Sequence, residues 1–421
     1  MVSAIWAASK RGNVDKVRRI LTETTDDIDG CFGPDETTPL FEAVMWDHVE
    51  VSALLLAAGA DTSITDYLGD TPLHSVMSTD TTTLLIESGA AVSAPNEEAN
   101  TPLHLAVSTD VVSLLIDNGA DIDAVNDAGS TPLHSAAEQG DEELVLLMVQ
   151  NGADLTAKNY RSDTALHLLM ESSPYEELLL GILRYSGVDV SSTGHYGNTL
   201  LGIASRRDLK DTVKFLLQRG ADVSIGDDSG DTPLHVAASD GMMQILLQNG
   251  AQVASINNFG DTPLHNASIF PDARRVQFLL ENGADVRAKN SLGESPIHIA
   301  AGQYNGVVLK ILLDHGSDVD SVNDLGETPL HLAASGNDGR AVQILIDHGA
   351  DEALKTFSGE TALSIADRCQ ALDAIQILKH AAECRAQRIA FAMGLQERLG
   401  MGSRVRQLYP DVMRMVLQHI V

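Results

Sequence analysis

The chain has few aromatic residues, few cysteines and no long apolar run. Aromatic residues are 4% of the 421 residues, so any core must be built from aliphatic side chains. The three cysteines, Cys31, Cys369 and Cys384, are too few for a disulfide framework and lack the spacing of a metal site. No apolar stretch approaches the roughly 18 residues of a membrane helix, and the N-terminus does not resemble a signal peptide. We therefore expect a cytoplasmic protein, with the nucleus as an alternative.

Catalytic motifs are also missing from the sequence. There is no Gly-rich phosphate loop after a strand, no GxSxG and no HExxH. The abundant carboxylates recur in turns, where they cap the chain and remain in water. We therefore expect no catalytic residue, no cofactor and no metal, although a fold does not by itself exclude a grafted active site.

The dominant feature that is present is a repeated tetrad, of which "TPLH" is the commonest form. Successive tetrads lie 30 to 35 residues apart, and a period of this size indicates stacked supersecondary units that cannot bury their apolar faces alone. The tetrads begin at Thr38, Thr71, Thr101, Thr131, Thr164, Thr199, Thr232, Thr262, Ser295, Thr328 and Thr361.

One repeat shows how each tetrad starts a helix. Thr328 is placed to cap the helix, and Pro329 suits the first helical position, where no N–H is needed. His331 follows at the third position, from which a side chain reaches back to the cap. A second amphipathic helix, "DGRAVQILID", ends at Gly349, which supplies a left-handed residue. The predicted unit is a helix, a turn, a second helix and a projecting hairpin.

These residues resemble the ankyrin repeat family. The tetrad, the small residues after it, the "LLxxGAD" close and the "DxxG" turn recur from about residue 36 to 378. The resemblance implies an all-α ankyrin repeat solenoid, built of helix-turn-helix units with β-hairpin loops, and a short helical C-terminal tail. We expect an N-terminal capping repeat over 1–36, about eleven repeats over 37–380, and the tail over 381–421.

The tetrad histidines are open to two interpretations. Eight of the fourteen histidines occupy the tetrad, and stacking would place them roughly 10 Å apart, too far to share one metal through bonds of about 2 Å. A structural role is therefore expected. Phe41, Gly202 and Ser364 replace the histidine in three repeats, where we expect weaker caps.

Irregular spacing marks four of the repeats. The units that begin at Thr71, Thr101 and Thr232 have 30 residues, and we expect the three missing residues to lie between the two helices. The unit at Thr164 has 35 residues, and Pro174 marks its longer inter-helix loop. Both changes should leave the stack intact.

Partners of this family usually bind the hairpin tips and the concave row of first helices. Single exposed apolar residues are ordinary, but their recurrence on one edge favours contact residues. The candidates at the tips are Tyr67, Tyr160, Tyr196, Phe259 and Phe357, and those on the first helices are Trp46, Arg206, Arg207, Ile269 and Phe270.

Positive charge is absent from a long stretch of the chain. Residues 20–157 contain no Lys or Arg but 26 Asp or Glu, and they carry most of the net charge of −31. This acidic block should repel nucleic acid and anionic membranes and attract a basic segment of a protein partner. The alternative is a surface that promotes solubility. We expect a monomer that binds neither nucleic acid nor membrane.

The tail departs from the repeat. "LYPDVMRMVLQHI" at 408–420 resembles the opening helix of the F-box, and ankyrin repeats followed by such a segment resemble proteins that recruit a Skp1-type adaptor of cullin–RING ubiquitin ligases. The match is short, and the rest of an F-box is missing downstream. The residues that would contact the adaptor are Leu408, Pro410, Val416 and Leu417. The alternatives are a scaffold that only binds a partner, with the tail as an end cap, and a substrate receptor of a ubiquitin ligase.

Overall fold

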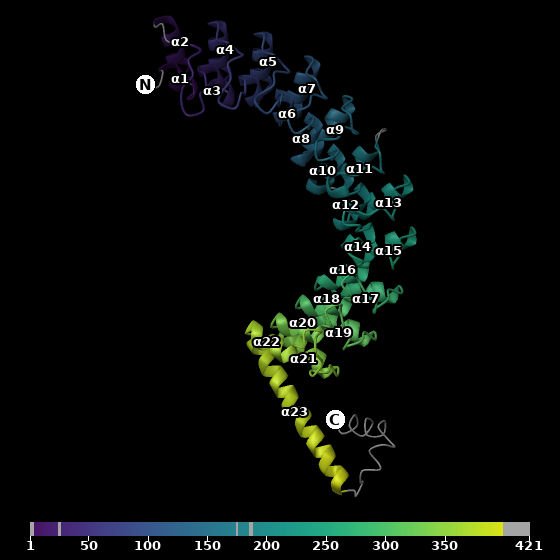
Figure 1. The fold of residues 1–421 in the computed structure, drawn as a ribbon. Coiled ribbons are helices and arrows are strands. Elements are labelled where there is room, and N and C mark those ends of the chain that lie inside the picture. Colours follow the sequence, from purple (N-terminus) through teal and green to yellow (C-terminus); the bar gives the residue numbers. More distant parts are fainter. Residues whose placement is uncertain (1–3, 24–26, 174–175, 185–187, 399–421) are drawn as a thin grey trace. The chain divides into compact units, whose positions relative to one another are not determined.

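The structure is a computed structural model that describes residues 4–23, 27–173, 176–184 and 188–398. The chain divides into two compact units, which comprise residues 1–228 and 229–421. Within each unit, helix pairs follow one another along the chain, one pair per repeat (Figure 1). This confirms the predicted all-α solenoid of helix-turn-helix units.

Unit 1 contains the helix pair of the N-terminal residues and the first six tetrad repeats. Its first helices are α1 (Ala4–Ser9), α3 (Pro39–Met45), the 3-10 helix η1 (Pro72–Ser75), α6 (Pro102–Leu105), α8 (Pro132–Glu138), α10 (Ala165–Ser172) and α12 (Leu200–Arg206). Its second helices are α2 (Val14–Glu23), α4 (Val49–Ala57), α5 (Thr79–Glu87), α7 (Thr109–Asp117), α9 (Glu142–Gln150), α11 (Glu176–Leu183) and α13 (Lys210–Gln218). A short 3-10 helix, η2 (His195–Gly197), forms one hairpin tip.

Unit 2 contains the remaining five repeats. Its first helices are α14 (Pro233–Val236), α16 (Pro263–Ile269), α18 (Pro296–Gly302), α20 (Pro329–Ser335) and α22 (Ala362–Cys369). Its second helices are α15 (Asp240–Gln248), α17 (Ala273–Glu281), α19 (Gly306–Asp314), α21 (Gly339–Asp347) and α23 (Leu372–Arg398). Across the described ranges, the hairpins contribute only isolated β-bridges, such as Lys355 with Thr361.

The repeat at Thr328 shows how local chemistry sets the helix ends. Thr328 is extended (φ −93°, ψ 166°), and α20 begins at Pro329 as expected. The N-cap of α21 is Asp338, whose carboxylate accepts the N–H of Ala341 at 3.0 Å. Gly349 ends this helix with φ +89°, and a Cβ there would meet nothing within 4 Å. A glycine is therefore required at position 349 by the left-handed backbone conformation, and not because a larger side chain would clash.

The core consists of small and aliphatic side chains from both helices of each repeat. In the same repeat, Leu330 and Ala334 of α20 and Val342 and Leu345 of α21 are at most 1% exposed. Fully burying a side chain of leucine size contributes roughly 1.5–3 kcal/mol, so the repeated apolar positions supply most of the stability. Since each helix pair also packs on its neighbours, this core runs through consecutive repeats of a unit.

The three 30-residue repeats have a shortened first helix. η1, α6 and α14 span four residues each, whereas α3, α8, α16, α18 and α20 span seven. The missing residues therefore come from the second turn of the first helix. We expected them to be missing from the connection between the helices, and this detail is corrected. Val76, Ala106 and Ala237 follow the single turn with ψ of 138°, 129° and 125°, so the chain leaves the helix there.

The hairpin tips are joined by backbone hydrogen bonds between consecutive repeats. The N–H of Tyr160 donates to the carbonyl of Ala128, and that of Phe357 to the carbonyl of Leu325, both at 3.0 Å. The same bond links Tyr67 to Asp35, Glu97 to Leu68, Asp127 to Glu98, Asp228 to Tyr196, Asn258 to Ser229, Ser291 to Phe259 and Asp324 to Leu292. These bonds hold the tips of each unit in register.

The last helix is longer than any other described helix. α23 has 27 residues, and it runs without interruption through residue 381, where we placed the start of the tail. Leu378 is 1% exposed, whereas most described side chains between 379 and 388 are exposed. In the part of α23 whose side chains are described, fully buried apolar packing ends at Leu378. The F-box-like segment at 408–420, with Leu408, Pro410, Val416 and Leu417, lies outside the described residues.

Candidate interaction surfaces

The tetrad histidines form hydrogen bonds within and between repeats. In one repeat, the N–H of Thr131 donates to Nδ1 of His134 at 3.1 Å, so this nitrogen is unprotonated. Nε2 then carries the hydrogen and donates to the carbonyl of Asp163 in the next repeat at 3.0 Å. The equivalent bonds join His74 to Asn100, His104 to Ser130, His167 to Ser192, His235 to Asp261, His265 to Glu294 and His298 to Glu327, at 3.0 to 3.3 Å. These histidines therefore have a structural role and link consecutive repeats.

Burial lowers the pKa of six of these histidines. The largest shift is at His298, which is fully buried and whose pKa falls from 6.5 to about 4. Desolvation disfavours the imidazolium form in each case, so the neutral ring that accepts at Nδ1 is retained at pH 7. The other five are His104, His134, His167, His265 and His331.

His331 differs from its counterparts. It is 1% exposed and its Nδ1 accepts from Thr328, but its Nε2, although close to the backbone of Glu360 in the next repeat, does not reach the geometry of a hydrogen bond. The last repeat is thus attached to its neighbour by one hydrogen bond fewer.

The tetrads that lack histidine keep a capped first helix. Where Phe41, Gly202 and Ser364 replace it, the N–H of that residue donates to the threonine hydroxyl at 3.0 to 3.3 Å. At Phe41 and Gly202 the bond that a histidine Nδ1 makes to the N–H of the cap residue is missing, which agrees with the weaker caps expected there. At Ser364 the hydroxyl accepts the N–H of Thr361 at 2.8 Å and completes the capping box, so the expectation is corrected at this position. Phe41 and Gly202 also lack the imidazole bond to the following repeat.

The five predicted tip aromatics are all exposed, and the rings of two of them contact the preceding hairpin tip. Tyr160 and Phe357 are the most exposed, yet a Cβ added to Gly129 or Gly326 would lie 2.7 Å from their rings. Each of these rings therefore packs on the turn glycine of the preceding tip. Tyr196 has a left-handed backbone (φ 55°) and lies against His195, with ring centroids 3.8 Å apart.

The predicted first-helix residues fall into two groups. Trp46, Ile269 and Phe270 are exposed, and the guanidinium of Arg275 lies 4.9 Å from the centroid of the Phe270 ring. Arg206 and Arg207 instead make contacts inside unit 1. Arg206 pairs with Glu171, and Arg207 donates to the carbonyl of Met170, both in the preceding repeat.

Trp46 is exposed but held in place. Its indole N–H donates to Oε2 of Glu42 at 3.1 Å, and the Glu42 side chain is only 2% exposed. Thr37 donates to the same carboxylate at 2.8 Å, and Lys10 lies 3.2 Å from it. The buried charge is thus compensated, and the Trp46 ring is fixed in one orientation while its face remains open to solvent. The buried position of Glu42 was not predicted, since no pattern distinguishes it from the other carboxylates.

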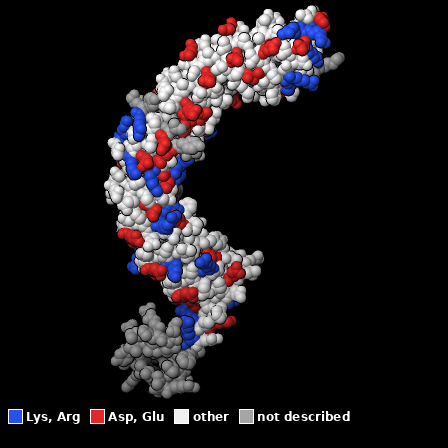
Figure 2. All heavy atoms as spheres, turned by 180° about the vertical axis from the view of Figure 1, so that it is seen from behind, with Lys and Arg blue, Asp and Glu red and all other residues white. Residues whose placement is uncertain are grey.

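The acidic block lies entirely in unit 1. Figure 2 shows Asp and Glu scattered over the visible face of this unit, beyond a cluster of Lys and Arg at its N-terminal end. Some of these carboxylates are fixed in turns. Hydrogen bonds from Ser63 lower the pKa of Asp61, and those from Thr156 lower the pKa of Asp154. No Lys or Arg occurs within residues 20–157, so the charge of the block is compensated only from outside it, as by Lys10 at Glu42 and Arg18 at Glu50.

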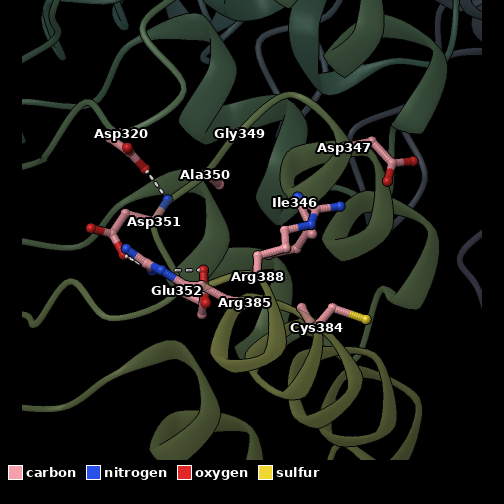
Figure 3. A pocket seen from close by; sticks show the side chains of 11 residues that line it. Asp320, Ile346, Asp347, Gly349, Ala350, Asp351, Glu352, Cys384, Arg385 and Arg388 are labelled. Carbon is pink, nitrogen blue, oxygen red and sulfur yellow. Dashed lines mark hydrogen bonds and ion pairs between the residues drawn. The ribbon is translucent and has the colours of Figure 1, made fainter. Parts of the chain in front are cut away.

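A polar pocket lies between α21 and α23 in unit 2. It has a volume of about 570 Å³, and Figure 3 shows Arg385 reaching from α23 towards Asp351 and Glu352. The guanidinium lies 2.6 Å from Asp351 and 3.1 Å from Glu352, and this ion pair lowers the pKa of Asp351. The arrangement ties α23 to the last hairpin, a contact that no sequence pattern predicted.

Metal-ligating side chains do not cluster in the residues that the structure describes. In the described part of the chain, no three His, Cys, Asp or Glu side chains are placed to hold a metal ion. Cys384 lies 3.6 Å from His380, one turn earlier on α23. No helix among the described residues is long and apolar enough to cross a membrane.

Comparison with known proteins gives one consistent result. The family model for ankyrin repeats in three copies matches overlapping segments that together run from residue 55 to 388, and the single-repeat model matches residues 35–67. The ankyrin repeat protein FPV230 of fowlpox virus (strain NVSL) is 43% identical over 63 residues, which are 14% of this chain and 34% of that protein. The match thus spans about a third of that relative's length.

Proposed function

This chain belongs to the ankyrin repeat family, a family of protein-interaction modules, and we propose that unit 1 binds a protein partner through a basic segment of that partner. The observation that carries the proposal is the absence of Lys and Arg from residues 20–157, alongside 26 carboxylates. A field of one sign accelerates the encounter with an opposite charge and disfavours partners of like charge.

Exposed carboxylates at the ends of second helices are the best candidates for this interaction. Asp80 and Asp110 lie in the first turns of α5 and α7, and Glu87 and Asp117 end the same helices. All four side chains are exposed, so their carboxylates are accessible to a partner. The exposed aromatic residues of unit 1, Tyr67, Tyr160, Tyr196 and Trp46, would add apolar contacts to this interaction. Phe259, Ile269, Phe270 and Phe357 belong to unit 2 and are separate candidates for partner contact.

The experiment measures binding of a lysine-rich peptide to the full chain by calorimetry at several salt concentrations. Changing the four helix-end carboxylates to amides should weaken binding and flatten its dependence on salt, because screening acts over about 8 Å at physiological ionic strength. The matched control changes four exposed carboxylates of unit 2 to amides and should leave binding unchanged: Asp240, Glu281, Asp314 and Asp347. Equal effects of both sets, or binding that does not depend on salt, would show that the block serves only solubility.

We propose a second, more specific role for the tail, that of an adaptor-binding helix. The support is its sequence: Leu408 and Pro410 precede an acidic residue and an apolar stripe that includes Val416 and Leu417. A helix of this length is marginal alone in water, so its stripe needs a surface to cover it. Such a protein would be a substrate receptor of a cullin–RING ubiquitin ligase.

The test compares the wild-type chain with the double variant Val416→Asp and Leu417→Asp. Binding of a purified Skp1-type adaptor should be lost in the variant, while the unfolding temperature of the repeats stays nearly unchanged. A lower unfolding temperature together with no adaptor binding by the wild-type chain would identify the tail as an end cap.

A further inference from the structure

Three exposed apolar side chains follow the first helices of consecutive repeats in unit 1. Trp46 follows α3, Met77 follows η1 and Val107 follows α6, and they are 54%, 63% and 60% exposed. Leu105, the last residue of α6, is also exposed. We call Trp46, Met77, Leu105 and Val107 the Trp46 surface. None except Trp46 was singled out by the sequence, because the shortened helices shift these positions.

These side chains lie in adjacent repeats. Ser78 and Thr81 donate to the carboxylate of Asp47 at 2.5 and 3.2 Å, which brings the end of α3 to the start of α5. Asp47 directly follows Trp46 and Ser78 directly follows Met77, so the two apolar residues are next to this contact. Val107 occupies the position of Met77 in the next repeat, whose first helix packs on η1.

The fold does not require large apolar residues at these positions. The third shortened helix, α14 in unit 2, carries Ala238 at the position of Met77 and Val107. Gln139 occupies the position of Trp46 in the repeat of α8, which has a complete first helix. The backbone is therefore formed equally well with a small or a polar side chain, and the exposed Met77, Val107 and Trp46 need another explanation.

The charges within the repeats that carry this surface are all of one sign, and Lys10 of the N-terminal repeat, which approaches the Glu42 carboxylate bound by Trp46, is paired with that carboxylate. Asp47, Asp80 and Asp110 are exposed, and each follows one of the three apolar residues within three positions. Glu138, at the end of α8, is exposed as well. No Lys or Arg occurs in these repeats, so a partner that covers the apolar side chains also meets a carboxylate beside each of them.

We propose that the Trp46 surface binds an amphipathic helix whose apolar face covers Trp46, Met77 and Val107 and whose flanking residues are Lys or Arg. The surface offers apolar side chains in a row with carboxylates beside them, and such a helix presents the complementary arrangement. Trp46 is suited to anchor the helix because its hydrogen bond to Glu42 already fixes the ring, so little side-chain freedom is lost on binding. This proposal rests on the proposed function and adds the location of the site and the chemistry of the segment.

The test uses the full chain and a helical peptide of about 18 leucines and lysines, with leucines every three or four residues. A peptide of the same composition with leucines and lysines in scrambled order measures charge attraction alone. Since the chain has only two tryptophans, Trp6 and Trp46, binding is followed by the shift of emission to shorter wavelength as Trp46 leaves water. Trp46→Gln, which places the residue of the α8 repeat at this position, should abolish the shift.

The decisive variant is Met77→Ala with Val107→Ala, which reproduces the side chain of Ala238 and should fold normally. It should weaken binding of the amphipathic peptide at least about tenfold, as expected for two lost apolar contacts. The matched control is Leu292→Ala with Leu325→Ala, which removes two equally exposed side chains from the tips of unit 2 and should change nothing.

Three results would overturn the proposal. If the scrambled peptide binds as tightly as the amphipathic one and the double alanine variant has no effect, the acidic block attracts basic segments without this site, and only the proposed function stands. If neither peptide binds even at low salt, the proposed function fails too. A dimer of the chain alone that the double alanine variant abolishes would instead assign the surface to a second copy.

Discussion

Acid should destabilise this protein well above the pH at which its carboxylates titrate, because burial holds six of its tetrad histidines neutral. Each accepts an N–H at Nδ1, and protonation there would replace an acceptor with a donor facing a donor. The clearest case is His298, whose pKa is about 4 in the folded chain against 6.5 for a free side chain. Its hydrogen bonds join Ser295 of its own repeat to Glu327 of the next.

The sign and size follow from these two pKa values. Since the folded pKa is below the unfolded value, the stabilisation is complete above pH 6.5 and is lost as the pH falls towards 4. The unfolded chain is then the form that takes up the proton. For His298 alone, lowering the pH from 7 to 5.5 should reduce the free energy of unfolding by about 1.2 kcal/mol. The lowered pKa values of His104, His134, His167, His265 and His331 act in the same direction.

The assay is urea unfolding at the two pH values for the wild-type chain, for His298→Gln and for the control His315→Gln, whose imidazole is exposed at the end of α19. His298→Gln should be less stable at pH 7 but should lose about 1.2 kcal/mol less than the wild-type chain on acidification. His315→Gln should lose as much as the wild-type chain. An equal loss in all three proteins would refute the assignment of a neutral, buried His298.

Further predictions concern other contacts. His134→Ala should cost roughly 1–2 kcal/mol of unfolding free energy in urea titration, with no change in metal content by elemental analysis, because it removes hydrogen bonds within and between repeats. Stoichiometric zinc lost with this substitution would contradict the structural role. Gly326→Ala should lower the midpoint of thermal unfolding, because φ is +73° and the new Cβ would lie 2.7 Å from the Phe357 ring. Gly59→Ala, where a Cβ would meet nothing within 4 Å, should lower this midpoint less. Arg385→Ala should speed amide hydrogen exchange in α23 while changing the free energy of unfolding by less than about 1 kcal/mol, because exposed ion pairs are weak. Unchanged exchange would show that the ion pair of Arg385 with Asp351 and Glu352 does not hold α23 in place.

The sequence predicted the features that depend on a few neighbouring residues. Thr328 and Pro329 start a helix, and Gly349 ends one, because their conformational preferences act locally. The fold class followed from the repetition of these signals. The location of the missing turn in η1 could not be predicted, because a three-residue deletion leaves the helix phase almost unchanged wherever it falls.

Contacts between repeats were beyond the reach of sequence patterns. Arg206 pairs with Glu171 in the preceding repeat, and the spacing of 35 residues gives no sign of this pair; its contact with a partner stays a prediction. The contacts of the Tyr160 and Phe357 rings with the preceding tip could not be predicted for the same reason. Such contacts depend on side-chain rotamers of stacked repeats, and periodicity reveals only that the repeats are stacked.

The charge of unit 1 is informative because of the residues that are missing from it. Turn carboxylates such as Asp61 and Asp154 accept hydrogen bonds from Ser63 and Thr156, so the fold itself accounts for them, and the same Asp-x-Ser/Thr turn recurs at Asp189. In unit 2, the corresponding hairpin of Asp285 also carries basic residues, and Arg287 and Lys289 each donate to a carbonyl of the next repeat. The scaffold thus accommodates Lys and Arg at hairpin positions, yet residues 20–157 contain none of the chain's 28. The fold therefore does not impose the absence of Lys and Arg from these residues. A partner that is repelled by positive charge explains this absence better than the acidic turns do. The peptide that binds the Trp46 surface should accordingly be basic.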